Sequence, residues 1–96
     1  MYSKNGNVNS YYITLRQNII QFNRYAIRKI GNKKIELAYD KDIRTIRIKL
    51  VDNGIEIPAH STISSTKFYN KFNINTMGRF EAIWDEDQQA FFVKLE

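Results

Sequence analysis

One segment of this chain matches another segment 45 residues later, and this internal repeat constrains the fold more than any other feature. Without a gap, KKIELAYDKDIRTIRIKL (33–50) aligns with GRFEAIWDEDQQAFFVKL (78–95). The two segments share a glutamate, two aspartates and a Lys-Leu ending, beside the alternating apolar positions that any two β-hairpins have in common. Upstream the offset becomes 42, so Ile13 aligns with Ile55 and Ile30 with Phe72. The sequence therefore predicts two similar units.

Each unit has the pattern of two short strands, a short helix and a β-hairpin. In the first unit, Asn23 is a good N-cap and Gly31 a good stop for a helix over Arg24–Ile30, and Asp40–Arg44 supplies the hairpin turn. The other elements that the pattern predicts are strands at Tyr12–Arg16, Ile19–Phe22, Ile35–Tyr39, Ile46–Leu50, Ile55–Ile57 (ended by Pro58), Thr62–Ser64, Arg79–Trp84 and Ala90–Leu95, and a helix around Thr66–Phe72 capped by Ser64 or Ser65.

The expected fold class is mainly β with two short helices, in which two β-β-α-β-β repeats form a small barrel. Residues 1–96 make a single domain, with repeats at about 11–51 and 53–96 and a flexible N-terminal segment over 1–10. The aromatic side chains that fall on inward positions are expected to form the core: Phe22, Phe68, Phe72, Phe80, Trp84 and Phe91.

Residue counts exclude several classes of function. The chain has no cysteine and one histidine, His60, which excludes disulfides, thiolate zinc sites and histidine clusters. It has no glycine-rich phosphate loop and no nucleophile elbow, and its paired carboxylates stand at hairpin turns in water. We therefore expect a protein that is not an enzyme and has no cofactor and no metal. The short apolar runs and polar N-terminus predict a cytoplasmic protein without membrane contact.

Charge is divided unevenly along the chain. Residues 1–50 carry eleven Lys or Arg against three acids, a net charge of +8, whereas residues 51–96 carry four bases against seven acids, a net charge of −3. Such asymmetry predicts that one half faces a polyanion and that the other half faces something else. The alternative is a solvated basic surface that only aids solubility.

The stretch IIQFNRYAIRKIGNKKIELAYDKDIRTIRIKL (19–50) resembles the AbrB/MazE group of swapped-hairpin DNA-binding domains. In that family two such units, normally from two chains, interleave their hairpins into one small barrel. The resemblance therefore implies a fused pseudo-dimer here. The sequence departs from the family where Phe22-Asn23 stands in place of the usual apolar-Pro pair at the start of the helix.

The resemblance also implies a DNA-binding site. In the family, basic residues of the loop between the first two strands and of the helix start meet DNA, and Arg16, Arg24, Arg28 and Lys29 fall at those places. Lys33 and Lys34 add positive charge nearby, and Asn18 offers a donor and an acceptor. The resulting hypothesis is a transcriptional regulator that grips duplex DNA, rather than a single strand, through the first repeat.

The second repeat supports an alternative from another class, a protein-binding adaptor or inhibitor of the kind that phages and mobile elements use. Phe92 falls on an outward position in an acidic half, with Glu81, Asp85 and Glu86 as companions at the interface. A homodimer is a further alternative. Arg47 and Lys49 are expected to face outward together, either as a phosphate track or as an ordinary solvated sheet face.

Overall fold

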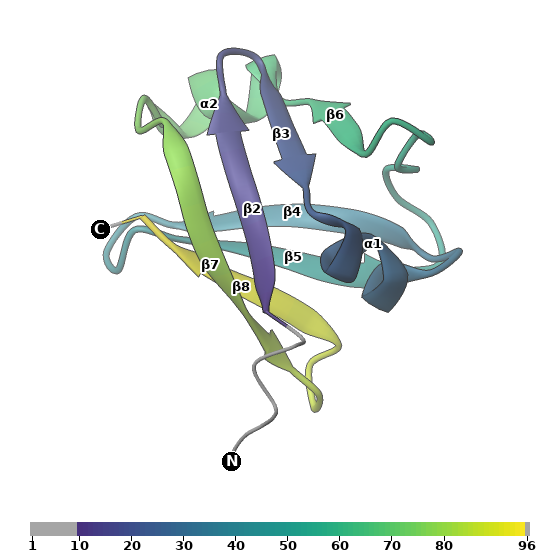
Figure 1. Cartoon of the computed structure of the whole chain (residues 1–96). Coiled ribbons are helices and arrows are strands. Elements are labelled where there is room, and N and C mark those ends of the chain that lie inside the picture. The colour runs from purple at the N-terminus through teal and green to yellow at the C-terminus, as the bar shows by residue number, and fades with distance from the viewer. Residues whose placement is uncertain (1–9, 96) are drawn as a thin grey trace.

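The computed structural model describes residues 10–95, which form one curled antiparallel sheet and two short helices (Figure 1). The sheet has seven strands in the order β4-β5-β8-β7-β2-β3-β6 and bends into a half-barrel. The prediction of a mainly β fold with two short helices is confirmed. The elements are β2 (Tyr11–Arg16), β3 (Ile19–Phe22), α1 (Arg24–Ile30), β4 (Lys34–Asp40), β5 (Thr45–Val51), β6 (Thr62–Ser64), α2 (Thr66–Phe72), β7 (Gly78–Asp85) and β8 (Ala90–Lys94).

The core fills the concave side of the sheet. Alternation along each strand places one set of side chains inside, so that Ile13, Ile48 and Phe91 are fully buried. The aromatic core predicted from the sequence is confirmed, because Phe22 is also buried and the remaining four rings, Phe68, Phe72, Phe80 and Trp84, pack half-buried against the cluster. Among residues 10–95, no helix is long and apolar enough to span a membrane.

Helix α1 begins and ends where the sequence predicts. The Asn23 side chain accepts a hydrogen bond from the Ala26 backbone N–H at 3.0 Å, which satisfies one donor of the first turn. At the other end Gly31 adopts a positive φ of 63°, and its N–H donates to the Ile27 carbonyl at 3.0 Å. The glycine is needed there because a side chain at positive φ is strained.

Helix α2 has the predicted bounds but a different start. Ser65 stands at the N-cap position, yet its side chain makes no capping bond, and its Oγ is buried without a hydrogen-bond partner among the described residues. The expected serine cap is therefore wrong as an interaction. The backbone explains the difference: Ser65 has φ −131° and ψ 11°, whereas Asn23 has the extended ψ of 169° that aims a cap side chain at the helix.

The expected strand at Ile55–Ile57 does not form. Only Ile55 pairs, in an isolated bridge with Ile35, where the two residues exchange backbone hydrogen bonds of 2.9 and 2.8 Å. The chain reaches this bridge through the turn that follows β5, and Gly54 passes so close to β4 that a Cβ there would lie 2.4 Å from the Ile35 carbonyl oxygen. Strands β3 and β6 have the predicted bounds, and the other strands differ from theirs by at most one residue at either end.

The two hairpins meet through their second strands. β5 pairs with β8 so that Ile46 lies opposite Val93, Ile48 opposite Phe91, and Arg47 opposite Phe92 in the middle. On its far side the hairpin β7–β8 pairs with β2, from Tyr11↔Ala82 to Leu15↔Gly78. On the outer edge of β4, the hairpin β4–β5 pairs with Ile55 alone among residues 10–95. Within residues 10–95, the outer edge of β7 is therefore paired along its length, whereas the outer edge of β4 is paired only at its start.

Candidate nucleic-acid interface

Helix α1 presents two arginines to solvent. Arg24 and Arg28 are exposed, and the Cζ atoms of their guanidinium groups lie 5.3 and 5.8 Å from the centroid of the Tyr25 ring. No carboxylate pairs with either arginine among the residues that the structure describes. Stacking on an aromatic ring orders guanidinium groups without neutralising their charge, so both remain available to an anion.

Lys29, which was predicted to belong to the same surface, is tied to the hairpin β7–β8. Its Nζ lies 4.8 Å from the Trp84 ring centroid and 3.8 Å from Glu86 Oε1. The Glu86 carboxylate also accepts a hydrogen bond from Trp84 Nε1 at 2.7 Å and one from Gln89 Nε2 at 3.1 Å. These bonds, with a smaller contribution from Lys29, hold the pKa of Glu86 below its usual value. Lys29 therefore links α1 to this turn.

Lys33 also has an acidic partner. Its Nζ donates to Asp52 Oδ1 at 2.9 Å, and this hydrogen bond lowers the pKa of the Asp52 carboxyl. Both side chains are exposed, so water and salt screen the pair. Lys34 is half-buried at the start of β4 and has no ion pair within residues 10–95.

Arg16 and Asn18 lie at the other end of β3 from α1 (Figure 1). The β2–β3 turn, in which Asn18 has a positive φ of 66°, sits beside helix α2. The Asn18 carbonyl accepts from the Ser65 N–H at 2.9 Å, and the Tyr69 hydroxyl donates to the Ile19 carbonyl at 2.8 Å. Burial raises the pKa of the Tyr69 phenol.

The predicted DNA-binding set is therefore not one surface, because β3 carries the chain away from its turn before α1 begins. One group (Arg24, Arg28, Lys29, Lys33) surrounds α1, and a second (Arg16, Asn18) lies with α2, which adds exposed Lys67 and Lys71. Sequence reasoning missed the role of Tyr25 beneath the α1 arginines. Its i−1 and i+3 spacing to Arg24 and Arg28 is the signal that reveals it.

The predicted protein-interface residues are also divided. Phe92 is half-buried opposite Arg47 on the convex face, with Ile83 on its other side, and Glu81 lies on the same face. Asp85 and Glu86 instead hold the β7–β8 turn, where Asp85 Oδ1 accepts from the Gln88 N–H at 3.0 Å. Arg47, predicted to face outward as part of a phosphate track or of a solvated sheet face, is half-buried, and its Nε is buried with no hydrogen-bond partner among the described residues.

Comparisons of the chain with protein-family models, with curated proteins and with solved structures each return no match. The described residues contain no group of three or more His, Cys, Asp or Glu side chains that could hold a metal ion. Function must therefore be argued from the side chains described above.

Proposed function

We propose that this protein is a small, non-enzymatic DNA-binding protein, a transcriptional regulator that grips duplex DNA through helix α1. The observation that carries the proposal is the pair Arg24 and Arg28, exposed, ordered on Tyr25 and free of any described carboxylate. Arginines of this kind neutralise phosphates, release counterions and form bidentate hydrogen bonds with guanine edges. The net charge of +8 over residues 1–50 adds long-range attraction to the same partner.

Duplex DNA is favoured over a single strand because Tyr12 and Tyr25 are half-buried and their rings already contact cationic side chains. Single-strand binding proteins stack bases on free aromatic rings. Here Arg24 and Arg28 lie over Tyr25, and the guanidinium of Arg79 lies 4.0 Å from the Tyr12 ring centroid. These rings support cations rather than bases.

We further propose that the chain is a fusion of two related β-β-α-β-β units with exchanged hairpins. The strand pairing supports this proposal. β7 of the second unit pairs with β2 of the first. In addition, replacing each residue of β5 and β8 by the residue aligned with it at the offset of 45 turns the pair Ile46↔Val93 into the pair Ile48↔Phe91, which is also present. The bridge Ile35↔Ile55 corresponds to the pair Ile13↔Phe80 under the same offsets. The helices, Arg24–Ile30 and Thr66–Phe72, are 42 residues apart.

Fluorescence anisotropy with a labelled random duplex, between about 50 and 200 mM salt, tests the DNA proposal. The double variant Arg24→Glu with Arg28→Glu is expected to abolish binding, and the matched control Lys67→Glu with Lys71→Glu makes the same change of charge on α2. The proposal predicts that the control binds with most of the original affinity. Equal loss of affinity in both variants would show that only net charge matters and would refute the α1 site.

A second candidate function rests on the convex face of β7 and β8. Ile83 is 58% exposed beside Phe92, and Ile43 in the neighbouring turn is 54% exposed, so apolar area gathers there. This observation favours the protein-binding alternative, as an adaptor or through self-association. Phe92→Ser is expected to lower the mass of any self-associated species in light scattering, and an unchanged mass would exclude self-association through this face.

A further inference from the structure

The edge of β4 is open after its first residues. Ile35 exchanges hydrogen bonds with Ile55 on this side, and no strand within residues 10–95 continues the pairing. Because backbone groups alternate in direction along a strand, the N–H and C=O groups of Leu37 and Tyr39 point toward the same free edge as those of Ile35. Two donors and two acceptors are thus presented in strand geometry, which is a template for an added strand.

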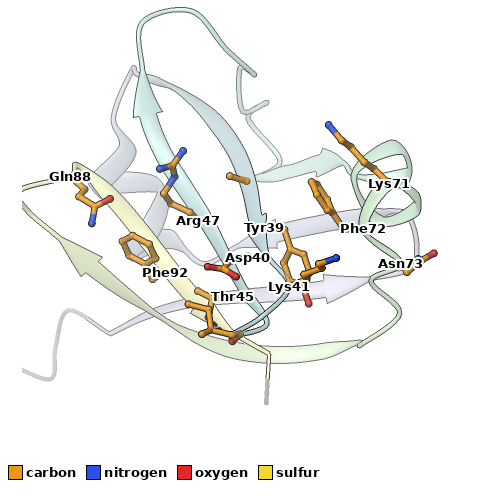
Figure 2. Close-up of a pocket in the computed structure, with 12 residues that line it drawn as sticks. Tyr39, Asp40, Lys41, Thr45, Arg47, Lys71, Phe72, Asn73, Gln88 and Phe92 are labelled. Atoms are coloured by element: carbon orange, nitrogen blue, oxygen red, sulfur yellow. Dashed lines mark hydrogen bonds between the residues drawn. The ribbon is translucent and has the colours of Figure 1, made fainter.

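The open edge runs beside helix α2. The Tyr39 and Phe72 rings contact each other, with centroids 5.6 Å apart, and Phe68 packs on Phe72 at 5.3 Å. A cavity of about 770 Å³ is lined by residues of β4, β5 and the C-terminal end of α2 (Figure 2). A second cavity, of about 710 Å³, is lined by Leu37 and by residues of the N-terminal end of α2, among them Phe68. Apolar side chains of α2, Phe68 and Phe72, therefore lie along both ends of the free edge.

The first cavity also carries unpaired positive charge. Arg47, Lys41 and Lys71 line it, against one carboxylate, Asp40, which accepts a hydrogen bond from the Asp42 N–H in its own turn. Figure 2 shows Arg47 beside Phe92, with Lys71 across the cavity on α2. Arg47 has no ion-pair partner among the described side chains, and its Nε is buried without an acceptor. A buried donor of this kind gains most from a charged acceptor.

Residue 38 connects the free edge with Arg47. Ala38 lies opposite Arg47 in the β4–β5 register, on the convex side of the strand. An added strand would place one residue opposite Ala38, on the same face, between the residues that bond to Leu37 and Tyr39. Because alanine is small, a glutamate at that place can reach over it to the Arg47 guanidinium.

We propose that the β4 edge at Leu37–Tyr39 binds an extended peptide segment of a partner protein, with the pattern apolar-Glu-apolar. Its backbone would pair with Leu37 and Tyr39, its apolar side chains would pack against Phe68 and Phe72, and its carboxylate would bind Arg47. This site is independent of the proposed DNA site on α1. A second copy of the chain fits less well, because the symmetric register that uses both Leu37 and Tyr39 sets Ala38 against Ala38 and offers Arg47 no carboxylate.

The probe is an acetylated, amidated peptide, Thr-Val-Glu-Val-Thr, titrated into the ¹⁵N-labelled full chain and followed by NMR. We expect saturable shifts of the Leu37 and Tyr39 amides and none at Ala82, whose edge is covered by β2. Replacing the glutamate by lysine is expected to weaken binding about ten-fold or more. Arg47→Gln in the protein is expected to weaken the Glu peptide about ten-fold and a Gln peptide by much less.

Leu37→Pro, which removes one edge N–H that no described group uses, is a second variant and is expected to lose the peptide. Each variant is checked by its amide spectrum, whose unchanged peak positions away from the β4 edge, Ala82 included, show that the fold is intact whether or not the chain binds DNA. Absence of saturable shifts at Leu37 and Tyr39, or equal binding of the Glu and Lys peptides, would overturn the proposal. A dimer in sedimentation that Leu37→Pro dissociates would also overturn it, in favour of a second copy as the occupant.

Discussion

The two hairpins of this protein have similar sequences but different neighbours. β7 is covered along five residue pairs by β2, while the outer edge of β4, whose Leu37 aligns with Ala82 of β7, is paired only at Ile35 within residues 10–95. The cause is chain connectivity. Tyr11 and Tyr12 run along β7 at the start of β2, whereas the residues before Ile55 must return from the end of β5. This return path leaves the outer edge of β4 after Ile35 without a strand among the described residues.

Because the two edges are covered unequally, we expect the same truncation to lower the free energy of unfolding by different amounts at two aligned positions. Ile13 in β2 is fully buried, so Ile13→Ala is expected to lower the free energy of unfolding by about 2–5 kcal/mol. Ile55, its aligned residue, is 40% exposed, and Ile55→Ala is expected to cost less than about 1 kcal/mol. Urea denaturation of both variants measures the gap. Equal costs would mean that residues 55–57 cover β4 as β2 covers β7.

The next largest loss of stability is expected for Gly54→Ala, because Gly54 lies very close to β4. A Cβ at this position would lie 2.4 Å from the Ile35 carbonyl oxygen and 2.7 Å from Val51 Cγ2, so Gly54→Ala is expected to cost about 1–3 kcal/mol in thermal or urea unfolding. The neighbouring substitution Asn53→Ala, at an exposed residue, is the control and should stay within about 0.5 kcal/mol of the original. A neutral Gly54→Ala would show that the chain is not held against Ile35.

The smallest expected difference in stability is between substitutions at the N-caps of the two helices. Asn23→Ala removes a 3.0 Å capping bond and is expected to cost about 1 kcal/mol. Ser65→Ala removes a buried hydroxyl that lacks a partner among the described residues, and it is expected to be neutral or slightly stabilising. Paired melting curves test this difference, which would disappear if Ser65 capped α2 as Asn23 caps α1.

Local chemistry allowed much of the fold to be predicted. Alternation located all seven observed strands near their bounds, with one further strand predicted at Ile55–Ile57 that does not form, and both helices were predicted at Arg24–Ile30 and Thr66–Phe72. These signals depend on residues a few positions apart. That Ser65 makes no capping bond could not be predicted from residue type, because capping depends on the backbone ψ at that residue.

The candidate site was predicted less well, because it depends on contacts between distant residues. Arg24 and Arg28 stand where the helix pattern places them, but Lys29 meets Glu86 and Lys33 meets Asp52, which the pattern does not show. The distance of Arg16 and Asn18 from α1 follows from the direction of β3. The open edge at Leu37–Tyr39 could not be predicted from the sequence, because it arises where the segment 53–57 leaves β4 after the single bridge Ile35↔Ile55.

Amide hydrogen exchange in the full chain, read by NMR, tests the inequality of the two edges most directly. The amides of Phe80 and Ala82 belong to the edge that β2 covers, and those of Leu37 and Tyr39 to the edge that no described strand covers. The structure predicts that Phe80 and Ala82 exchange at least about a hundred times more slowly than Leu37 and Tyr39. Comparable protection at the two edges would contradict it, because it would mean that a strand already occupies β4.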